Sequence, residues 1–384
     1  METATKKILS GYKSSPLGII PEDWKVKRIG EFAPLQRGFD LPTDKIIKGN
    51  YPVVYSNGIL NYHHEYKVKG PGVVTGRSGT IGKVTYVESD YWPHNTSLWV
   101  TDFKNNDPRY VFHLYKYLDL SKFASGSGVP TLNRNDVHSY KIAVPPIHVQ
   151  QRIVSVLSLW DTAIEKQTAL IEQLTLRKLG LMQQLLTGKK RLKGFEGEWK
   201  RIKAGEIFKS ISVKGNGSEV LLSATQEHGV IPRDQLEGRV TMPTGDTNSF
   251  KLVEVGDFVI SLRSFQGGLE YSEHRGIVSP AYTVLKPIVE IDKPFYRYYF
   301  KSAEFIGHLA IAVIGIRDGK QISYEDFCFV KIPYPNIEEQ KAISAVLLQA
   351  DKEIEIQKPK LAAMQEQKKG LMQVLLTGKK RINK

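Results

Sequence analysis

One stretch decides the architecture, Leu181-Met182-Gln183-Gln184-Leu185-Leu186-Thr187-Gly188-Lys189-Lys190-Arg191, because it returns almost unchanged as Leu371-Met372-Gln373-Val374-Leu375-Leu376-Thr377-Gly378-Lys379-Lys380-Arg381. The two copies stand at an offset of 190 in the numbering, which holds without a gap from Pro145 and Pro335 onward. Solenoid repeats are about 20–50 residues long, so the larger offset indicates a duplicated domain.

The duplication extends toward the N-terminus at a smaller offset. Trp24 and its neighbours match Trp199 and its neighbours at an offset of 175, so a domain begins near each tryptophan. Farther along, the offset is 186, and the matched pairs are Arg77/Arg263, Ser78/Ser264, Gly82/Gly268 and Pro108/Pro294. Since the offset rises from 175 to 190, we expect the second copy to carry about 15 extra residues in loops.

Residues 32–144 and 207–333 consist of short β-prone runs broken by Gly, Asn and Pro, a pattern that predicts strands and loops. A helical pattern follows each of them. We therefore predict an α+β fold in which two mainly-β domains alternate with two long helices. The predicted segments are a first domain (1–144), a first helix (145–193), a second domain (194–334) and a second helix (335–384).

The helical segments carry apolar residues at alternating spacings of four and three, which indicates a coiled-coil seam over more than four heptads. Its positions are Ile153, Leu157, Trp160, Ile164, Gln167, Ile171, Leu174, Lys178, Leu181 and Leu185 in the first helix, and Ile343, Leu347, Ala350, Ile354, Gln357, Leu361, Met364, Lys368, Leu371 and Leu375 in the second. The polar seam residues either fix the register of the pair or face water where the helices splay.

The order domain, helix, domain, helix predicts that the helices run antiparallel, because the second can return to the start only by reversing direction. The result is a circular, pseudo-two-fold arrangement with the C-terminus near the N-terminus. Each helix of roughly 40 residues is about 60 Å long.

Local signals predict where the helices begin, end and bend. Asn336 with Glu339 three positions later predicts a capping box at the start of the second helix. Gly188 and Gly378 are placed to end the helices. Pro359 lies inside the second helix, where proline removes a backbone hydrogen bond, so we predict a kink there.

The chain is strongly basic, with 54 Lys and Arg against 40 Asp and Glu and a net charge of +14. This excess favours a polyanionic partner such as nucleic acid, with a merely basic protein as the alternative. A single cysteine, Cys328, excludes an internal disulfide framework and a cysteine-based zinc site. We find no membrane-length apolar run and no signal-peptide core, and we expect a cytoplasmic protein.

Several motifs, in this order and duplicated, resemble the specificity (S) subunits of type I restriction-modification systems. They are Ile20-Pro21-Glu22-Asp23-Trp24, Arg77-Ser78-Gly79-Thr80-Ile81-Gly82-Lys83, Thr131-Leu132-Asn133 with Asp136, Pro145-Pro146, and the Leu-Thr-Gly-Lys-Lys-Arg helix endings. The resemblance covers essentially the whole chain. Gly79 and Thr131 have Phe265 and Gln321 as counterparts, so the loop contacts of the two halves are not expected to be equivalent.

The resemblance implies that each domain is a target recognition domain for one half of an interrupted, asymmetric double-stranded DNA sequence. It also implies that the helices are spacers and dock two methyltransferase (M) subunits, which bind S-adenosylmethionine and methylate adenine at N6. Motor-nuclease (R) subunits would join them for cleavage that requires ATP and Mg. In this view the chain itself is non-catalytic, binds no cofactor or metal, and has no membrane partner.

The residues show no chemistry of their own that contradicts this view. An adenine methyltransferase of this type needs Asn or Asp followed by Pro-Pro and an aromatic residue, and no string in the chain qualifies. Gly76 to Lys83 resembles a phosphate-binding loop, but the glycine spacing is one position too long and Val84 replaces the magnesium-binding hydroxyl. His63-His64-Glu65 is interpreted as a polar loop in preference to a metal site.

Arginine can make paired bonds to guanine, and Asn or Gln to adenine, whereas Lys and Arg elsewhere hold phosphates. The candidates for base contacts are Asn57, Arg77, Ser78, His94, Asn95, Asn133 and Arg134 in the first domain, and Gln226, Arg263, Ser264, Arg275, Arg317, Lys320 and Gln321 in the second. The phosphate candidates are Lys189, Lys190, Arg191, Lys193, Lys379, Lys380 and Arg381, which are alternatively solvated helix ends.

Two other functions are consistent with the same residues. The first is a coiled-coil adaptor with non-specific DNA affinity, and the second is an enzyme with an unrecognised site. The target bases and the spacer length do not follow from the sequence, because base recognition depends on which loop side chains reach a DNA groove.

Overall fold

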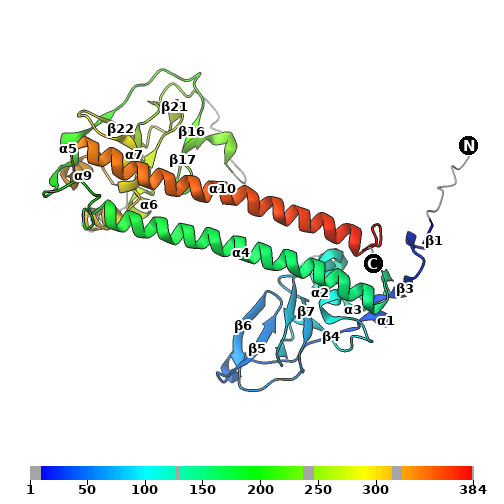
Figure 1. Ribbon diagram of the computed structural model, residues 1–384. Helices are drawn as coiled ribbons and strands as arrows, with labels where there is room; N and C mark the ends of the chain where they lie inside the picture. Colours follow the sequence, from blue (N-terminus) through cyan, green and yellow to red (C-terminus); the bar gives the residue numbers. More distant parts are fainter. Residues whose placement is uncertain (1–9, 127–129, 237–245, 314–321, 383–384) are drawn as a thin grey trace, which may run out of the picture. The chain divides into compact units, whose positions relative to one another are not determined.

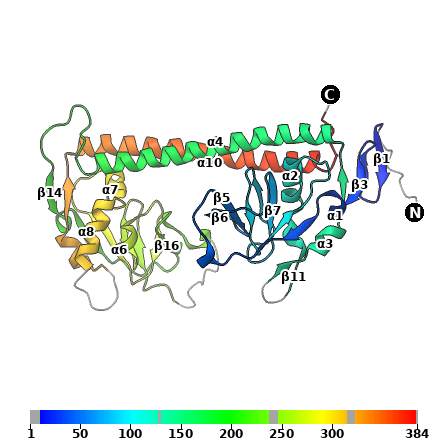
Figure 2. The ribbon, with the colours of Figure 1, turned by 90° about the horizontal axis from the view of Figure 1, so that it is seen from below.

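The computed structural model describes residues 10–126, 130–236, 246–313 and 322–382 (Figures 1 and 2). The chain divides into two compact units. Unit 1 comprises residues 1–168 and 359–384, and unit 2 comprises residues 169–358. Each unit therefore holds one domain together with part of each long helix, α4 (Ile147–Leu185) and α10 (Ile337–Leu375).

The first domain contains short strands, as its sequence predicts. They are β1 (Tyr12–Ser15), β2 (Gly18–Pro21), β3 (Lys25–Arg28), β4 (Leu35–Arg37), β5 (Tyr51–Tyr55), β6 (Gly58–His63), β7 (Gly72–Gly76), β8 (Val84–Val87), β9 (Trp92–Pro93), β10 (Ser97–Val100), β11 (Ala124–Ser125), β12 (Thr131–Leu132) and β13 (Lys141–Val144). The main sheet is antiparallel, with the order β4-β10-β7-β8. A second sheet has the order β6-β5-β9, and β13 pairs with β3.

The helical segments of the first domain are α1 (Ile29–Phe32), η1 (Thr43–Lys45), α2 (Pro108–Leu118), η2 (Leu120–Phe123) and α3 (Arg134–Ser139). Helix α2 begins where the Asp107 carboxylate accepts hydrogen bonds from the backbone N–H groups of Arg109 (2.8 Å) and Tyr110 (3.0 Å). The buried face of α2 shares a core with Leu157 of α4 and Leu375 of α10. It thus joins the sheet to the long helices within unit 1 (Figure 2).

The second domain repeats this plan. Its strands are β14 (Lys200–Lys203), β15 (Phe208–Ile211), β16 (Leu222–Thr225), β17 (Gly229–Pro232), β18 (Lys251–Val253), β19 (Phe258–Ile260), β20 (Glu270–Tyr271), β21 (Gly276–Val278), β22 (Thr283–Pro287) and β23 (Lys331–Tyr334). Its helical segments are α5 (Ala204–Ile207), η3 (Arg233–Gln235), α6 (Ser264–Gly267), α7 (Lys293–Tyr299), α8 (Ala303–Val313) and α9 (Tyr324–Phe329). The sheet β15-β22-β19-β20 corresponds to β4-β10-β7-β8.

Helix α7 corresponds to α2, with a one-position correction to the sequence alignment. Both helices begin at a capping aspartate, Asp107 or Asp292, and the backbone N–H of each aspartate donates to a glutamine of a long helix at 2.9 Å. These glutamines, Gln150 and Gln340, stand at an offset of 190, whereas the two aspartates stand at an offset of 185. The alignment of Pro108 with Pro294 at an offset of 186 is therefore wrong, because the proline sits one position later in α7.

Within each unit the long helices pair in opposite directions. In unit 1, Asp161 of α4 forms an ion pair with Lys368 of α10. Leu157, near the start of α4, shares a core with Leu375, at the end of α10. In unit 2, Lys178 binds Asp351 at 2.5 Å, and the neighbouring Arg177 binds Glu353. Every seam position predicted from the heptad pattern is buried or half-buried. The two seam lysines do not simply face water, because each has a carboxylate partner on the other helix.

The ends of the two helices have the same geometry. Gly188 and Gly378 have φ values of +71° and +70°, and each follows the last helical turn. A Cβ atom at Gly188 would lie 3.2 Å from the Trp199 ring, and one at Gly378 would lie 2.5 Å from Pro21 and 3.3 Å from Trp24. Each helix end therefore packs against the tryptophan at which a domain begins, with glycine needed for both φ and space.

Two sequence predictions concern α10, a capping box at its start and a kink at Pro359. The Asn336 side chain accepts a hydrogen bond from the Glu339 backbone N–H at 2.8 Å, as the capping prediction requires. The Glu339 side chain binds Arg191 and Trp199 instead of the cap, so the reciprocal half of the capping box is wrong. Helix α10 is unbroken at Pro359, and a kink there stays a prediction. Among the described residues, no helix is long and apolar enough to span a membrane.

Candidate nucleic-acid interface

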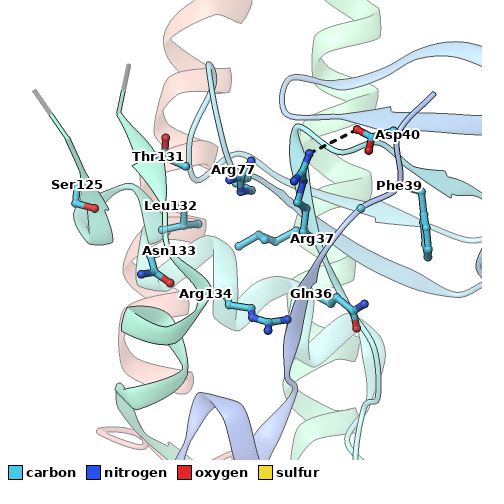
Figure 3. A pocket seen from close by; sticks show the side chains of 12 residues that line it. Gln36, Arg37, Phe39, Asp40, Arg77, Ser125, Thr131, Leu132, Asn133 and Arg134 are labelled. Carbon is cyan, nitrogen blue, oxygen red and sulfur yellow. Dashed lines mark hydrogen bonds and ion pairs between the residues drawn. The ribbon is translucent and has the colours of Figure 1, made fainter. Parts of the chain in front are cut away.

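A cleft of about 700 Å³ opens on the first domain at the end of the main sheet (Figure 3). Three arginines from separate segments line it: Arg37 at the end of β4, Arg77 directly after β7, and Arg134 at the start of α3. Asp40, which binds Arg37 at 3.5 Å, is the acidic residue in this lining. The cleft is therefore electropositive and presents guanidinium groups, which suit both bases and phosphates.

The backbone that carries Arg77 is held on both sides. Its N–H donates to the Thr96 carbonyl at 2.9 Å, and its carbonyl accepts from the Leu132 N–H at 2.8 Å. Gly82, with φ of +79°, brings the loop back so that its N–H reaches the Gly76 carbonyl at 3.2 Å. A side chain on a fixed backbone loses less entropy on binding a ligand than one on a free loop.

The second domain has a cleft of about 660 Å³, lined by Gln226, His228 and Arg263 among others. Arg263 is the counterpart of Arg77 in the duplicated sequence. The Nε2 group of Gln226 donates to the Arg263 carbonyl at 3.5 Å. The equivalent arginine thus lines the cleft of each domain, although the residues around it differ.

An ion pair between half-buried Lys301 and buried Glu270 stabilises the loop that carries Arg263. Lys301 binds both oxygens of Glu270 at 2.7 Å and also donates to the Gly267 carbonyl at 3.0 Å. Burial raises the pKa of Glu270, while Lys301 opposes that shift. Gly268, the counterpart of Gly82, has φ of +75°. These contacts give the second loop a support that matches the one in the first domain.

Three predicted base contacts are tied to structural partners. Ser264 is 1% exposed and its hydroxyl accepts from the Ser261 N–H at 2.8 Å, so its proposed base contact is withdrawn. Arg275 is clamped by two carboxylates, those of Glu219 and Glu254. His94 packs on Tyr55, with ring centres 4.3 Å apart, and hydrogen-bonds to the Thr96 hydroxyl. Burial lowers the pKa of His94.

The remaining base candidates occupy mixed positions. Asn133 lines the first cleft but also caps α3 by accepting from the Asn135 N–H at 3.0 Å. Asn95 donates to Asp40, and Ser78 pairs through its backbone with Thr131. Asn57 is in the turn after β5. Arg317, Lys320 and Gln321 lie outside the described residues.

The phosphate candidates divide into two groups. Arg191 binds the buried carboxylate of Glu339, so its assignment as a phosphate contact is wrong. Arg381 pairs with Asp23 at 3.2 Å. The members without an ion pair among the described residues are Lys189, Lys190, Lys193, Lys379 and Lys380.

Gln36 and Arg37 are among the cleft residues that sequence reasoning missed. They lie on β4, well before Arg77 in the chain, and the sheet brings them beside it through the intervening strand β10. The signal in the sequence was an amide and a basic side chain directly before Gly38. A strand this short has no spacing pattern that would distinguish these two residues from others.

The segment His63-His64-Glu65 places metal-binding atoms within 4.8 Å of one another. The Nδ1 atom of buried His63 already hydrogen-bonds to the backbone of Ile47 at 3.1 Å, and its ring packs edge-on against Trp92. These contacts engage His63 at the end of β6, and the interpretation of the segment as a polar loop stays a prediction.

The sequence matches the family described as type I restriction modification DNA specificity domain, over residues 21–176 and again over residues 196–366. The chain belongs to this family. Two matches along one chain confirm the duplication, and the resemblance noted in the sequence is confirmed with them. A type I specificity subunit with two DNA recognition domains is therefore the function that the comparisons support over a coiled-coil adaptor.

Relatives from Methanocaldococcus jannaschii match over nearly their full length. The type I restriction enzyme MjaVIII specificity subunit is 26% identical, over 94% of this chain and 94% of the relative. The putative type I restriction enzyme MjaX specificity subunit is 25% identical, over 97% of each. The S subunit of a type I restriction-modification system from M. genitalium has a similar fold, with a TM-score of 0.58 at 16% identity, over 92% of this chain and 96% of that one.

Proposed function

We propose that each recognition domain binds one half of an interrupted, asymmetric DNA site and that its arginine-lined cleft contacts the bases. The observation that carries this proposal is the placement of equivalent residues, Arg77 and Arg263, in the clefts of the two domains. A guanidinium can donate two hydrogen bonds to a guanine in the major groove, which fixes both base identity and register.

The two half-sites differ because the cleft linings differ. Beside Arg77 stand two further arginines, whereas beside Arg263 stand Gln226 and His228. An amide side chain favours adenine, and a cluster of guanidinium groups favours guanine or closely spaced phosphates. Asymmetry of the DNA site thus follows from loops that diverged after duplication.

We propose that the helices α4 and α10 act as an antiparallel coiled coil that sets the distance between half-sites. Support comes from each unit separately, since the pairs Asp161/Lys368 and Asp351/Lys178 repeat one contact at an offset of 190. The packing of Gly188 on Trp199 and of Gly378 on Trp24 supports a circular, pseudo-two-fold order.

The chain is a non-catalytic member of a larger assembly. It binds double-stranded DNA and docks two methyltransferase subunits, with motor-nuclease subunits joining for cleavage. S-adenosylmethionine, ATP and Mg are bound by those partners, and the chain binds none of them. Membership of the family and the missing methyltransferase motif support this assignment.

Co-expression with a type I methyltransferase subunit and mapping of N6-methyladenine across the host genome tests the proposal. We expect one interrupted motif with two different halves. A complex that assembles and methylates without any motif would contradict it. Binding that is salt-sensitive but indifferent to sequence would favour the adaptor function instead.

A further inference from the structure

A cavity of about 240 Å³ lies beside Trp24 in unit 1, where the end of α10 meets the start of α4. Its polar lining comprises His148, Arg152, Lys380, Arg381 and Asp23, and its apolar lining includes Val149. Four basic side chains therefore face one carboxylate. These basic side chains are not part of either recognition cleft, so DNA-base contacts in the clefts do not explain them.

The equivalent place in unit 2 is filled by a carboxylate of the chain itself. Arg191 donates from Nε to Glu339 Oε1 at 2.6 Å and from Nη2 to Oε2 at 2.7 Å. The Trp199 indole N–H donates to the same carboxylate at 3.0 Å. Glu339 is 1% exposed, so one arginine edge and one indole hold a fully enclosed carboxylate.

The duplication identifies what is missing in unit 1. Arg381 and Trp24 correspond to Arg191 and Trp199, but Val149 stands where Glu339 stands in unit 2. Arg381 uses Nη2 for Asp23 and donates from Nη1 to the Gly11 carbonyl, both at 3.2 Å. Among the described residues, its Nε group and the indole N–H of Trp24 have no hydrogen-bond partner, although Trp24 is only 3% exposed.

The matched positions around the cavity are more basic in unit 1 than in unit 2. His148 corresponds to Glu338 and Arg152 to Ala342, while both copies have a lysine at the position of Lys190 and Lys380. Compared with unit 2, unit 1 therefore has two fewer carboxylates at these matched positions, and it has an imidazole and an additional guanidinium. Such a site attracts an anion from outside the chain.

We propose that this cavity binds a carboxylate supplied from outside the chain, in the position that Glu339 occupies in unit 2. Arg381 Nε and the Trp24 indole N–H donate to its two oxygens, and the surrounding basic side chains stabilise its charge. A planar carboxylate is the ligand that the same two residue types bind in unit 2, which favours it over a tetrahedral phosphate. The ligand is either a free small carboxylate or the side chain of an acidic residue.

The test is a titration of the full chain, with its tryptophan indoles labelled with ¹⁵N, against sodium acetate and against sodium chloride at equal ionic strength. We expect a saturable shift of the Trp24 indole resonance with acetate only, and no shift at Trp199. The assignment comes from Trp24→Phe. Acetylated, amidated glutamate and its glutamine analogue show whether a side-chain carboxylate also binds.

Variants separate the site from general charge effects. Val149→Glu places a carboxylate where unit 2 has one, and we expect it to weaken acetate binding at least about tenfold, the value of one charge-assisted hydrogen bond. Arg381→Lys keeps the charge but removes Nε and should weaken binding similarly. In the reciprocal variant Glu339→Val, the Trp199 indole should become responsive to acetate.

The proposal is overturned if acetate leaves the Trp24 resonance unmoved, or if Val149→Glu and Arg381→Lys both retain the wild-type response. Inorganic phosphate that shifts Trp24 at lower concentration than acetate would also overturn it, because the site would then prefer a tetrahedral anion. Either response, to acetate alone or to acetate and the glutamate compound, supports the proposal and identifies the source of the carboxylate.

Discussion

The side chain of Lys368 of α10 is 7% exposed and forms an ion pair with Asp161 of α4. The duplication repeats this contact in unit 2 between Lys178 and Asp351, where the lysine side chain is 23% exposed. In each unit, the seam lysine therefore pairs with an aspartate on the opposite helix. Such a pair favours one register, because a shift of the helices would leave a charge buried alone.

Replacing Asp161 with Asn should destabilise unit 1 by about 1.5–3 kcal/mol, because it leaves the buried Lys368 ammonium without a counter-charge while the Asp161 side is 34% exposed. The matched change Asp351→Asn should cost less, since Lys178 is better hydrated. Urea unfolding of both variants checks the difference. Equal losses, or a loss no larger than that of the exposed pair variant Glu88→Gln, would contradict the interpretation.

His113 of α2 predicts a pH dependence of stability. Burial lowers its pKa from 6.5 to about 4, although the nearby Asp161 opposes the shift. Because the unfolded chain then takes up the proton more readily, unfolding becomes easier as the pH falls from about 6.5 to 4. The loss should be on the order of 3 kcal/mol.

The second unit supplies the control for this effect. Tyr298 occupies the position equivalent to His113 and donates a hydrogen bond to Asp351 at 2.6 Å. His113→Tyr should therefore fold and lose the part of the pH dependence that lies between 4 and 6.5. Denaturant midpoints measured at several pH values test this, and an unchanged slope in the variant would exclude His113 as the source.

Arg77→Ala should alter one half of the methylated motif, and Arg263→Ala the other half. Loss of a paired arginine contact should reduce discrimination at one base by about 1–3 kcal/mol. Mapping of N6-methyladenine in cells that carry each variant is the measurement. Arg275→Ala is the control, because Glu219 and Glu254 already hold that side chain and the motif should stay intact. A change in both halves from one substitution would contradict the modular interpretation.

Gly268→Ala should destabilise the second domain by at least about 2 kcal/mol, because φ there is +75° and the new Cβ would lie 1.7 Å from the Phe300 carbonyl oxygen. The matched control is Gly180→Ala on α4, where a Cβ meets nothing within 4 Å. That change should stabilise the helix by up to about 1 kcal/mol. Thermal unfolding distinguishes the two signs.

The sequence predicted what depends on periodicity and on the duplication. The heptad pattern identified the seam residues, and glycine chemistry identified the helix ends at Gly188 and Gly378. The partners of the seam lysines were missed because Asp161 and Asp351 lie one position beyond a seam residue, where the pattern assigns solvent. Side-chain direction across two helices is not contained in the spacing along one.

The recognition clefts show the limit most clearly. Arg37, Arg77 and Arg134 come from three segments that meet only when the sheet and α3 have formed. Ser78 and Ser264 follow matched arginines, yet Ser264 is enclosed because it completes a turn with Ser261. The same Arg-Ser dipeptide therefore has a half-buried serine in the first domain and a fully buried serine in the second, although the arginine lines a cleft in both.

The core of unit 1 joins residues near Trp24 to Met372, Leu375 and Leu376, which follow only after the whole of unit 2 (169–358) has been added to the chain. During translation the core of the first recognition domain therefore stays incomplete, with apolar surface exposed to solvent, until the ribosome has synthesised the second domain and the end of α10. A premature stop within the last turns of α10 would damage the domain at the opposite end of the gene. The domain made first is the one completed last.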